Sequence, residues 1–272
     1  MCTTCGCGET DSILISKPPQ INTDELKVAH NHHEHENDGH HHHHHDHDHP
    51  HGHSHEKTVL DIEQDILQNN NLLAERNRGY FEAKNIFAMN LVSSPGSGKT
   101  SLLEKTLKDL KSEISFNVIE GDQQTFNDAN RIQAVQIPVV QINTGQACHL
   151  DSDMVNKAVK ELNPNENSIL FIENVGNLVC PALFDLGENK RIVIISTTEG
   201  DDKPIKYPDM FLHSDICIIN KIDLLPYVNF DVEQAKEYAM RVNHHLEFFE
   251  VSVTSGEGMD KWYDWLRKQI KK

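Results

Sequence analysis

The segment SSPGSGKT lies between an apolar run and a helical pattern, and this order restricts the fold more than any other feature. A strand, a glycine-rich loop and a helix in register form a P-loop. Gly96 and Gly98 let the backbone turn so that several amides point at one anion, and the helix N-terminus adds partial positive charge. Lys99 would reach the β- and γ-phosphates of a nucleotide, and the Thr100 hydroxyl would ligate Mg²⁺.

The loop departs from the full P-loop pattern at one position, since Ser93 stands where a glycine is expected. The glycines that curve the loop remain, so the departure is mild. The alternative is a chance glycine-rich turn, which would have no reason to join a strand to a helix. The residues predicted to bind nucleotide here are Pro95, Gly96, Ser97, Gly98, Lys99, Thr100 and Ser101.

From residue 84 onward, apolar runs of strand length alternate with helical patterns. Continuous Ile- and Val-rich strands between helices are typical of a mostly parallel sheet covered on both faces. The expected fold is an α/β P-loop NTPase, with ligands at the carboxyl ends of the strands. The expected strands are 86–94, 116–122, 137–143, 168–174, 191–197, 215–220 and 246–253, and the expected helices are 101–113, 127–135, 151–162, 231–243 and 258–272.

Composition divides the chain near residue 57. Residues 1–57 are nearly free of aromatic residues, and they hold most of the chain's 19 histidines. Such a segment buries too little apolar surface to offset the entropy of ordering it, so we expect a disordered, metal-binding tail. Residues 58–83 show apolar residues at helical spacing, which predicts one or two helices leading into a folded domain that spans 58–272.

The chain is acidic, with a formal net charge of −17 at pH 7. This charge disfavours general affinity for nucleic acid or anionic membranes. No apolar run reaches the roughly 18 residues needed to cross a bilayer, and no secretory signal pattern is present. We therefore expect a cytoplasmic protein, in which closely spaced cysteines bind metal or do redox chemistry.

The tetrapeptide NKID follows an apolar strand and bears on the choice between ATP and GTP. It resembles the guanine-specificity motif of GTPases, in which Asp223 would accept hydrogen bonds from guanine N1 and N2 donors that adenine lacks. Asn220 would hold the loop, and the Lys221 stem would pack on the base plane. The later segment SVTSGEG resembles the last base-contacting loop of this class, which adds Ser252 and Val253. The sequence thus predicts a domain that binds GTP and GDP.

Two acidic residues at strand ends, Asp122 and Glu173, are the candidates to complete a Mg²⁺ site with Thr100. Mg²⁺ takes oxygen ligands and usually keeps waters and phosphate oxygens as the rest, so either acid could act directly or through water. An ordinary strand-end acid is the alternative for each. Together with Lys99 they form the predicted catalytic set. No arginine finger and no water-orienting glutamine stands out, so we expect slow intrinsic hydrolysis.

The segment CTTCGC places three thiols, Cys2, Cys5 and Cys7, within six residues. Thiolates are soft ligands suited to nickel, copper(I) or zinc, and CxxC is a spacing that lets two thiols meet one metal. A redox CxxC is the alternative, but that motif belongs at a helix start in a folded domain. The pattern therefore favours metal binding.

A second group of possible ligands follows the strands of the folded domain. Cys148 and His149 come after the expected strand 137–143, and Cys180 follows Glu173 by a few residues, so all three belong to the ligand side of the sheet. On spacing alone, buried and inert cysteines are the preferred interpretation. Cys217 lies inside a strand and is interpreted as core.

The histidine run at residues 40–45 continues into DHDHPHGHSH, with histidine at every second position, so it does not have the form of an expression tag. Neutral imidazoles ligate nickel or zinc, and many overlapping weak sites would give capacity rather than one defined geometry. The tract is interpreted as a metal reservoir. Its run of candidate ligands is His40, His41, His42, His43, His44 and His45.

Taken together, several segments resemble one family. MCTTCGCG, the histidine-rich segment, SSPGSGKTSLL, EGDQQT, TGQACHLD, FIENVGNLVCP and NKIDLLP are similar to the hydrogenase nickel-incorporation (maturation) GTPases of the HypB family. The resemblance covers nearly the whole chain. It implies a SIMIBI-type G domain, related to signal-recognition and MinD-type proteins.

The resemblance also implies a function and its partners. Nickel is delivered to [NiFe]-hydrogenase precursors with GTP hydrolysis, and a small nickel/zinc metallochaperone and the hydrogenase large-subunit precursor are the implied partners. The terminal cysteine motif would be a tight nickel site. The residues Cys148, His149 and Cys180 would form a nickel/zinc site at the interface of a GTP-promoted homodimer.

Three other functions compete with nickel delivery to a hydrogenase. A urease-accessory nickel GTPase shares the fold and the P-loop, but it carries Cys-Pro-His, whereas Cys148 and His149 are adjacent here. A nickel or zinc storage protein would not need an intact P-loop and NKID. An ATP-using metal or cluster scaffold is disfavoured by Asp223.

Overall fold

The structure, a computed structural model, describes residues 13–17, 59–123 and 127–270. These residues form one eight-stranded sheet whose strands lie in the order β1-β4-β3-β5-β2-β6-β7-β8. Seven strands are parallel, and β1 at one edge runs antiparallel to β4. The strands are β1 (Leu14–Ser16), β2 (Ile86–Ser93), β3 (Phe116–Asp122), β4 (Val139–Asn143), β5 (Ser168–Glu173), β6 (Lys190–Ser196), β7 (Ile216–Asn220) and β8 (Glu247–Val251).

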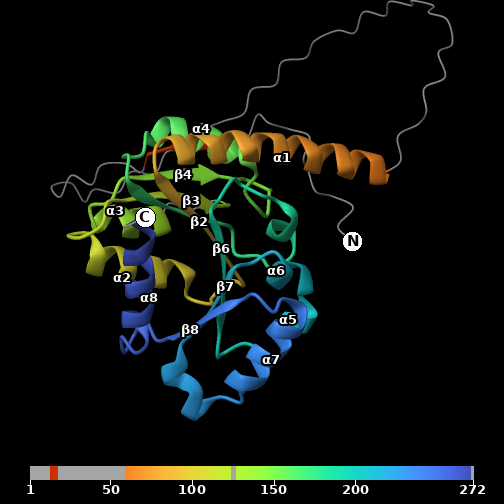
Figure 1. Cartoon of the computed structure of the whole chain (residues 1–272), viewed down its shortest axis with the longest axis vertical. Helices are drawn as coiled ribbons and strands as arrows, with labels where there is room; N and C mark the ends of the chain where they lie inside the picture. Colours follow the sequence, from red (N-terminus) through yellow and green to blue (C-terminus); the bar gives the residue numbers. More distant parts are fainter. Residues whose placement is uncertain (1–12, 18–58, 124–126, 271–272) are drawn as a thin grey trace, which may run out of the picture.

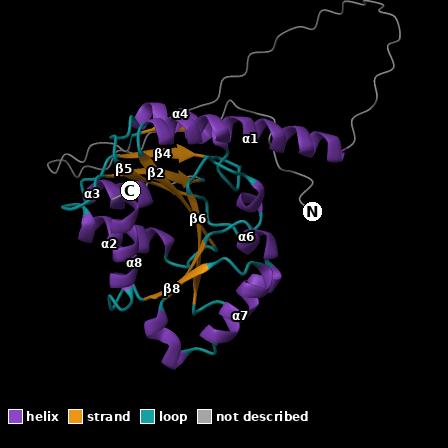
Figure 2. Cartoon of the chain, in the orientation of Figure 1, coloured by secondary structure: helices purple, strands orange, loops and turns teal. Residues whose placement is uncertain are grey.

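Helices cover both faces of the sheet, as Figures 1 and 2 show. One face carries α2 (Lys99–Leu110), α3 (Asn127–Ala134) and α8 (Met259–Ile270). On the other, α1 (Val59–Ala83) and α4 (Ser152–Leu162) lie side by side over β4, β3 and β5. The same face carries α6 (Pro208–Leu212) and α7 (Val232–Val242) over β6 and β7. Shorter elements are α5 (Lys203–Lys206), η2 (Cys180–Leu183) and η3 (Ile222–Tyr227).

The central strands are apolar on both sides because both sides are covered. In β2, Met89 and Leu91 pack toward α2 and α8, while Ala88 and Val92 pack toward the opposite layer. All four side chains are almost completely buried. The predicted α/β fold with a mostly parallel sheet is therefore confirmed.

The helix α1 is a single helix, and two buried asparagines explain its modest apolar pattern. Asn77 donates to the carbonyls of Ser152 (2.9 Å) and Leu186 (3.1 Å), and Asn70 donates to the carbonyl of Asp185 (2.8 Å). These bonds satisfy polar groups that burial would otherwise leave unpaired. They join α1 to the start of α4 and to the segment between η2 and β6.

The prediction that all of residues 1–57 are disordered is wrong at residues 14–16, which form β1. Ile13 and Ile15 pack against the apolar cluster beneath α4, and this burial offsets the cost of ordering a short strand. Composition averaged over 57 residues hid so short an element. The predicted ligands Cys2, Cys5, Cys7 and His40 to His45 lie outside the described residues.

The loops at the carboxyl ends of β2, β5 and β7 carry the P-loop, Glu173 and the NKID motif. Among the helices described, none is long and apolar enough to span a membrane. The candidate functional residues thus gather at the carboxyl ends of the parallel strands.

Candidate nucleotide and metal sites

The P-loop turns sharply at Gly96 (φ 79°) and Gly98 (φ 93°), both in the left-handed region that favours glycine. A Cβ atom on Gly98 would lie 2.5 Å from Asn220 Nδ2, so a side chain there would clash with the base motif. The Gly98 carbonyl accepts from the Leu102 amide at 2.9 Å, which starts α2. The loop therefore has the backbone geometry of a phosphate cradle at a helix N-terminus.

The NKID motif is bonded directly to the P-loop. Asn220 Nδ2 donates to the carbonyl of Ser97 at 2.9 Å, and Lys221 Nζ donates to the carbonyl of Gly96 at 2.8 Å. Lys221 adopts the left-handed conformation (φ 63°), and the side chain of Asn220 accepts from its amide at 2.8 Å. The predicted holding role of Asn220 is thus visible in the structure.

Asp223 is held by the last predicted base-contacting loop. Ser252 Oγ donates to Asp223 Oδ1 at 2.6 Å, and the same hydroxyl accepts from the Ser255 amide at 3.1 Å. Ser252 is fully buried, whereas Asp223 is half-buried and keeps its second oxygen for another donor. Val253 packs against the apolar cluster beneath α8. The bond from Ser252 fixes the Asp223 carboxylate, and its role in binding guanine stays a prediction.

Lys99 reaches the end of β5. Its ammonium lies 2.7 Å from Glu173 Oε1, which also accepts from Thr100 Oγ1 at 2.6 Å. The Lys99 side chain is 10% exposed and that of Glu173 is 0% exposed. Burial alone would lower the pKa of Lys99, but the carboxylates of Glu173 and Glu120 raise it. Because these two glutamates lie beside it, the Lys99 ammonium stays charged although it is buried.

Glu120, in the middle of β3, belongs to the same group, although the sequence analysis did not select it. Burial and the Glu173 carboxylate raise the pKa of Glu120 well above its ordinary value. Burial alone would also raise the pKa of Glu173, but Lys99 and hydrogen bonds to its charged form lower it. The setting of Glu120 therefore favours its protonated form, and that of Glu173 favours the carboxylate.

An acidic cluster suited to a hard cation results. One carboxylate oxygen from each of Glu120, Asp128 and Glu173 lies within 4.8 Å of the others. In the described part of the chain, Glu120 Oε2 and Glu173 Oε2 are buried without a hydrogen-bond partner. Orphaned carboxylate oxygens beside the Thr100 hydroxyl are the donors that Mg²⁺ prefers, so these residues fit that ion.

Asp122, the acid chosen from the sequence, ends β3 and points to the same face as Glu120, two residues earlier. Its Oδ1 accepts from the Gln123 amide at 2.6 Å. Its role as a Mg²⁺ ligand stays a prediction. The alternation of side chains along β3 is a signal in the sequence that could have led from Asp122 to Glu120, but the sequence analysis did not use it.

Lys203 is a second cation that the sequence analysis missed. It lies in α5, and its ammonium contacts Ser94 Oγ of the P-loop at 3.2 Å and Glu199 Oε2 at 3.1 Å. The side chains of both charged residues are largely buried. A further positive charge thus stands beside the phosphate cradle, supplied by a helix far along the chain.

The structure brings together the second candidate metal set, which the family resemblance implied. Sγ of Cys148, a ring nitrogen of His149 and Sγ of Cys180 lie within 4.8 Å of one another. Cys148 Sγ is 3.9 Å from His149 Nδ1. Burial lowers the pKa of His149, against an opposing effect of Asp151, and so favours the neutral imidazole that ligates metal. Two thiols and an imidazole suit nickel or zinc and leave room for a further ligand.

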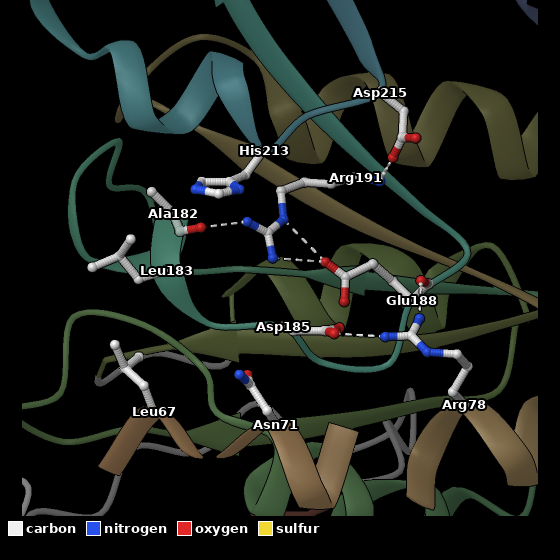
Figure 3. Close-up of a pocket in the computed structure, with 10 residues that line it drawn as sticks. All are labelled: Leu67, Asn71, Arg78, Ala182, Leu183, Asp185, Glu188, Arg191, His213 and Asp215. Atoms are coloured by element: carbon white, nitrogen blue, oxygen red, sulfur yellow. Dashed lines mark hydrogen bonds and ion pairs between the residues drawn. The ribbon is translucent and has the colours of Figure 1, made fainter. Parts of the chain in front are cut away.

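A buried ion pair holds the segment that follows Cys180 (Figure 3). Arg191 Nε donates to Glu188 Oε1 at 3.0 Å, and the guanidinium also donates to the carbonyls of Ala182 (2.6 Å) and Phe184 (2.7 Å). These groups border a cavity of about 350 Å³. The Phe184 ring lies 4.0 Å from that of His149, so the pair also supports the metal ligand.

The segment 173–180 joins the nucleotide site to the metal site. Its Gly176 lies against the P-loop, where an added Cβ would be 3.3 Å from Pro95 Cα. The Asn174 side chain accepts from the Leu150 amide at 3.1 Å, and Asn177 Nδ2 donates to the Cys148 carbonyl at 3.4 Å. The segment that begins at Glu173 therefore contacts the P-loop and the loop that carries Cys148, and it ends at Cys180.

Comparison with known proteins decides the family. The family model "CobW/HypB/UreG, nucleotide-binding domain" matches residues 87–250. The hydrogenase maturation factor HypB of Escherichia coli K12 is 48% identical over 287 residues, which cover 99% of each chain. The chain belongs to the HypB family. The HypB of Azotobacter vinelandii is 56% identical, over 79% of this chain and 71% of that one.

Solved structures of HypB proteins agree with the fold. A crystal structure of HypB from Archaeoglobus fulgidus matches with a TM-score of 0.70 and 38% identity, covering 75% of this chain and 99% of that one. A crystal structure of HypB from Helicobacter pylori in complex with nickel matches with a TM-score of 0.70 and 37% identity, covering 75% and 95%. The described domain is therefore a P-loop GTPase domain of the HypB type.

Proposed function

We propose that this chain is a GTP-hydrolysing nickel metallochaperone that binds and stores nickel and inserts it into [NiFe]-hydrogenase precursors. The segment 173–180 carries the proposal. It begins at Glu173, which bonds Lys99 and Thr100, and it ends at Cys180, one of the three ligands of the internal metal set. Because so few residues separate the two sites, nucleotide state and metal geometry are mechanically linked.

The nucleotide half of the mechanism follows from the acidic cluster. Mg²⁺ held near Thr100 and Glu173 would neutralise charge on the β- and γ-phosphates. Lys99 would then exchange its contact with Glu173 for a phosphate oxygen, and the cation would favour the charged form of Glu120. Asp122 remains a candidate to act directly or through water. The described domain offers no securely placed residue to orient the attacking water, which supports slow turnover.

The part of the mechanism that concerns the metal depends on the loops that follow β4 and β5. When Glu173 changes partners, the bonds from Asn174 to Leu150 and from Asn177 to Cys148 transmit the change to the Cys-His-Cys set. Nickel or zinc there would in turn favour one nucleotide state, because coupling is reciprocal. A set of three ligands with an open position also suits a homodimer promoted by GTP, since a partner copy would complete it.

The N-terminal tail adds nickel storage to the proposed function. Cys2, Cys5 and Cys7 would bind nickel tightly, and the histidine tract would hold further nickel or zinc in weaker sites. A small nickel/zinc metallochaperone and the hydrogenase large-subunit precursor are the partners we propose. The closely spaced thiols need a reducing compartment, so we place the function in the cytoplasm. In this proposal residues 1–57, apart from β1, form the metal-binding tail, and residues 58–272 form the GTPase domain.

Insertion into a precursor tests the proposal directly. The nickel-loaded chain is incubated with purified hydrogenase large-subunit precursor and either GTP or GDP, and nickel in the precursor is measured. We expect transfer that depends on GTP and is lost in a Cys148→Ser, Cys180→Ser chain. Equal transfer with GDP would contradict the proposal, because nickel release would then not depend on GTP and the protein would act as a nickel store.

A further inference from the structure

Asn90 is a buried polar residue in the otherwise apolar strand β2. Its side chain is 0% exposed, and by the alternation of the strand it points to the same face as Ala88 and Val92. A buried amide costs free energy unless its donor and its acceptor are both paired. The bonds that Asn90 makes therefore explain how an amide can occupy this position.

On one side, Asn90 bonds to the segment that begins at Glu173. The Asn174 amide group donates to Asn90 Oδ1 at 3.3 Å. The side-chain oxygen of Asn174 accepts from the Leu150 amide at 3.1 Å. Because Leu150 directly follows His149 in the chain, the Asn174 side chain holds the backbone beside one of the candidate metal ligands.

On the other side, Asn90 bonds to a buried ion pair. Asn90 Nδ2 donates to Glu188 Oε1 at 3.1 Å, and the same oxygen accepts from Arg191 Nε at 3.0 Å. Figure 3 shows that Arg191 also reaches Ala182, whose carbonyl accepts from its guanidinium at 2.6 Å. Ala182 lies two residues after Cys180 in η2, so this bond holds the backbone beside a second candidate ligand.

The same guanidinium also supports the imidazole ligand. Arg191 Nη2 donates to the Phe184 carbonyl at 2.7 Å, and the centroid of the Phe184 ring lies 4.0 Å from that of the His149 ring. His149 is therefore held from both ends of one chain of hydrogen bonds, through Leu150 at one end and through Phe184 at the other.

This chain of bonds is a second connection between the nucleotide site and the Cys-His-Cys set. The first connection is the backbone of the segment 173–180. The second leaves that segment at Asn174, crosses β2 at Asn90, and reaches η2 through Glu188 and Arg191, with all of these hydrogen bonds buried. A buried polar group whose partner moves must follow it or stay unpaired, because no bulk water replaces the lost bond.

We propose that Asn90 is a positioning residue that couples the geometry of the Cys-His-Cys set to the nucleotide state. A change of partners at Glu173 moves the adjacent Asn174. Asn90 passes this movement to Glu188 and so to Arg191. The spacing of the metal ligands then differs between the GTP and GDP states, which changes their affinity for a soft divalent ion such as nickel(II). The inference rests on the proposed function, because it requires that this set binds nickel.

A purely structural role of Asn90 is the alternative. A buried amide with two partners stabilises the core whether or not it transmits a movement, so a loss of stability does not distinguish the two roles. Only the coupling requires that Asn90 change the ratio of the nickel affinities measured with GTP and with GDP. This ratio is therefore the quantity to measure.

Nickel titrations of Asn90→Leu test the coupling, since leucine keeps the branched shape but neither donates nor accepts a hydrogen bond. The full chain is used with Cys2, Cys5 and Cys7 replaced by serine, once with GDP and once with a non-hydrolysable GTP analogue. Thiolate-to-nickel absorption reports binding at Cys148 and Cys180 without a contribution from histidine sites. In this parent chain we expect affinities that differ by at least about fivefold.

In Asn90→Leu the ratio of the two nickel affinities should fall to about one, because the link between the two sites is removed. Affinity for GDP and for the GTP analogue in the metal-free protein should stay native, because Asn90 lies inside β2 rather than in the P-loop. A purely structural role would lower the thermal midpoint and leave the ratio unchanged.

Asn117→Leu is the matched control. Asn117 is also almost completely buried in a central strand, β3, and its amide group donates to Ser168 Oγ at 3.0 Å. This bond lies near the amino ends of β3 and β5, so its loss should lower the thermal midpoint but keep the ratio of at least about fivefold. Loss of the ratio in Asn117→Leu as well would mean that any weakened core loses the coupling, and it would overturn the role of Asn90.

Glu188→Gln tests the same chain of bonds from its next residue and decides the question if Asn90→Leu does not fold. Glutamine keeps the size of the side chain but replaces one acceptor oxygen with a donor, so the ratio should again fall toward one. The double variant should lower the ratio no further than Asn90→Leu alone, because both changes break one connection. A native ratio in the folded variants would overturn the inference. A ratio of about one already in the parent chain, or no thiolate-to-nickel absorption there, would overturn the proposed function instead.

Discussion

The ammonium of Lys99 lies 2.7 Å from Glu173 Oε1, and both groups are buried at the carboxyl ends of adjacent strands β2 and β5. Glu173 Oε1 also accepts from Thr100, so Lys99 and Thr100 share one carboxylate oxygen. We expect nucleotide with Mg²⁺ to compete for these contacts, which makes the pair our proposed starting point for any change on ligand binding.

Replacing Lys99 by alanine should separate the two functions of the chain. GTP hydrolysis should fall by at least about 100-fold, because a buried charge that stabilises the transferring phosphoryl group is lost. Nickel binding by the terminal cysteines should be unchanged, because residues 2–7 do not depend on the P-loop. Turnover assays and nickel titration measure the two effects, and exposed Lys108→Ala is the control. Loss of both activities in Lys99→Ala would contradict the division.

Replacing Asp223 by alanine should remove the preference for guanine. The carboxylate, oriented by Ser252 at 2.6 Å, would otherwise pair with two base donors. Leaving those donors unpaired should weaken GTP and GDP binding by about 100-fold while leaving ATP affinity unchanged. Calorimetric titration of the three nucleotides measures this, with exposed Asp209→Ala as the matched control. A parallel loss of ATP affinity would mean that Asp223 only supports the loop.

Glu120→Gln should change how stability depends on pH. A carboxyl whose pKa is raised on folding binds its proton more tightly when folded, so stability falls as pH rises from the ordinary value of 4.5 through the raised one. Glutamine cannot ionise, so in chelator-treated buffer the thermal midpoint of the variant should fall less steeply above pH 4.5 than that of the native chain. Exposed Glu82→Gln should keep the native slope. Identical slopes for native and Glu120→Gln chains would refute the raised pKa of Glu120.

The thiols of the GTPase domain should differ sharply in reactivity. Cys217 is 1% exposed, and burial raises its pKa to about 12, whereas Cys148 and Cys180 are only partly buried. At about pH 8 an alkylating reagent should modify the latter two and spare Cys217, and nickel or zinc should protect them. Mass spectrometry reads out each site in a chain with the terminal cysteines replaced. Modification unaffected by metal would argue against the internal set.

Much of this site was predictable because its residues occupy strand ends. The P-loop, NKID, Glu173 and the Cys148–His149 pair each follow an apolar run, and parallel strands bring such residues to one edge. The order of the strands in the sequence does not reveal their order in the sheet. Their carboxyl ends nevertheless lie at the same end of the sheet, whatever that order is. Cys217, inside a strand, was correctly assigned to the core.

Residues of the site that lie inside a strand, rather than in the loop after it, could not be predicted in this way. Glu120 lies in the interior of β3, where an acid is easily taken for a neighbour of Asp122 rather than a group facing Lys99. Arg191 lies at the start of β6, and its bonds to backbone carbonyls leave no sequence pattern. The strand β1 was missed because three residues carry too little periodicity to stand out in a polar, histidine-rich segment.

The central claim is that nucleotide state sets the metal geometry through the segment 173–180. Equilibrium dialysis of nickel measures it in a chain whose terminal cysteines are replaced by serine, once with GDP and once with a non-hydrolysable GTP analogue. The account predicts affinities that differ by at least about fivefold, and no difference after Cys148→Ser with Cys180→Ser. Equal nickel affinity in both nucleotide states, with Cys148 and Cys180 intact, would contradict it.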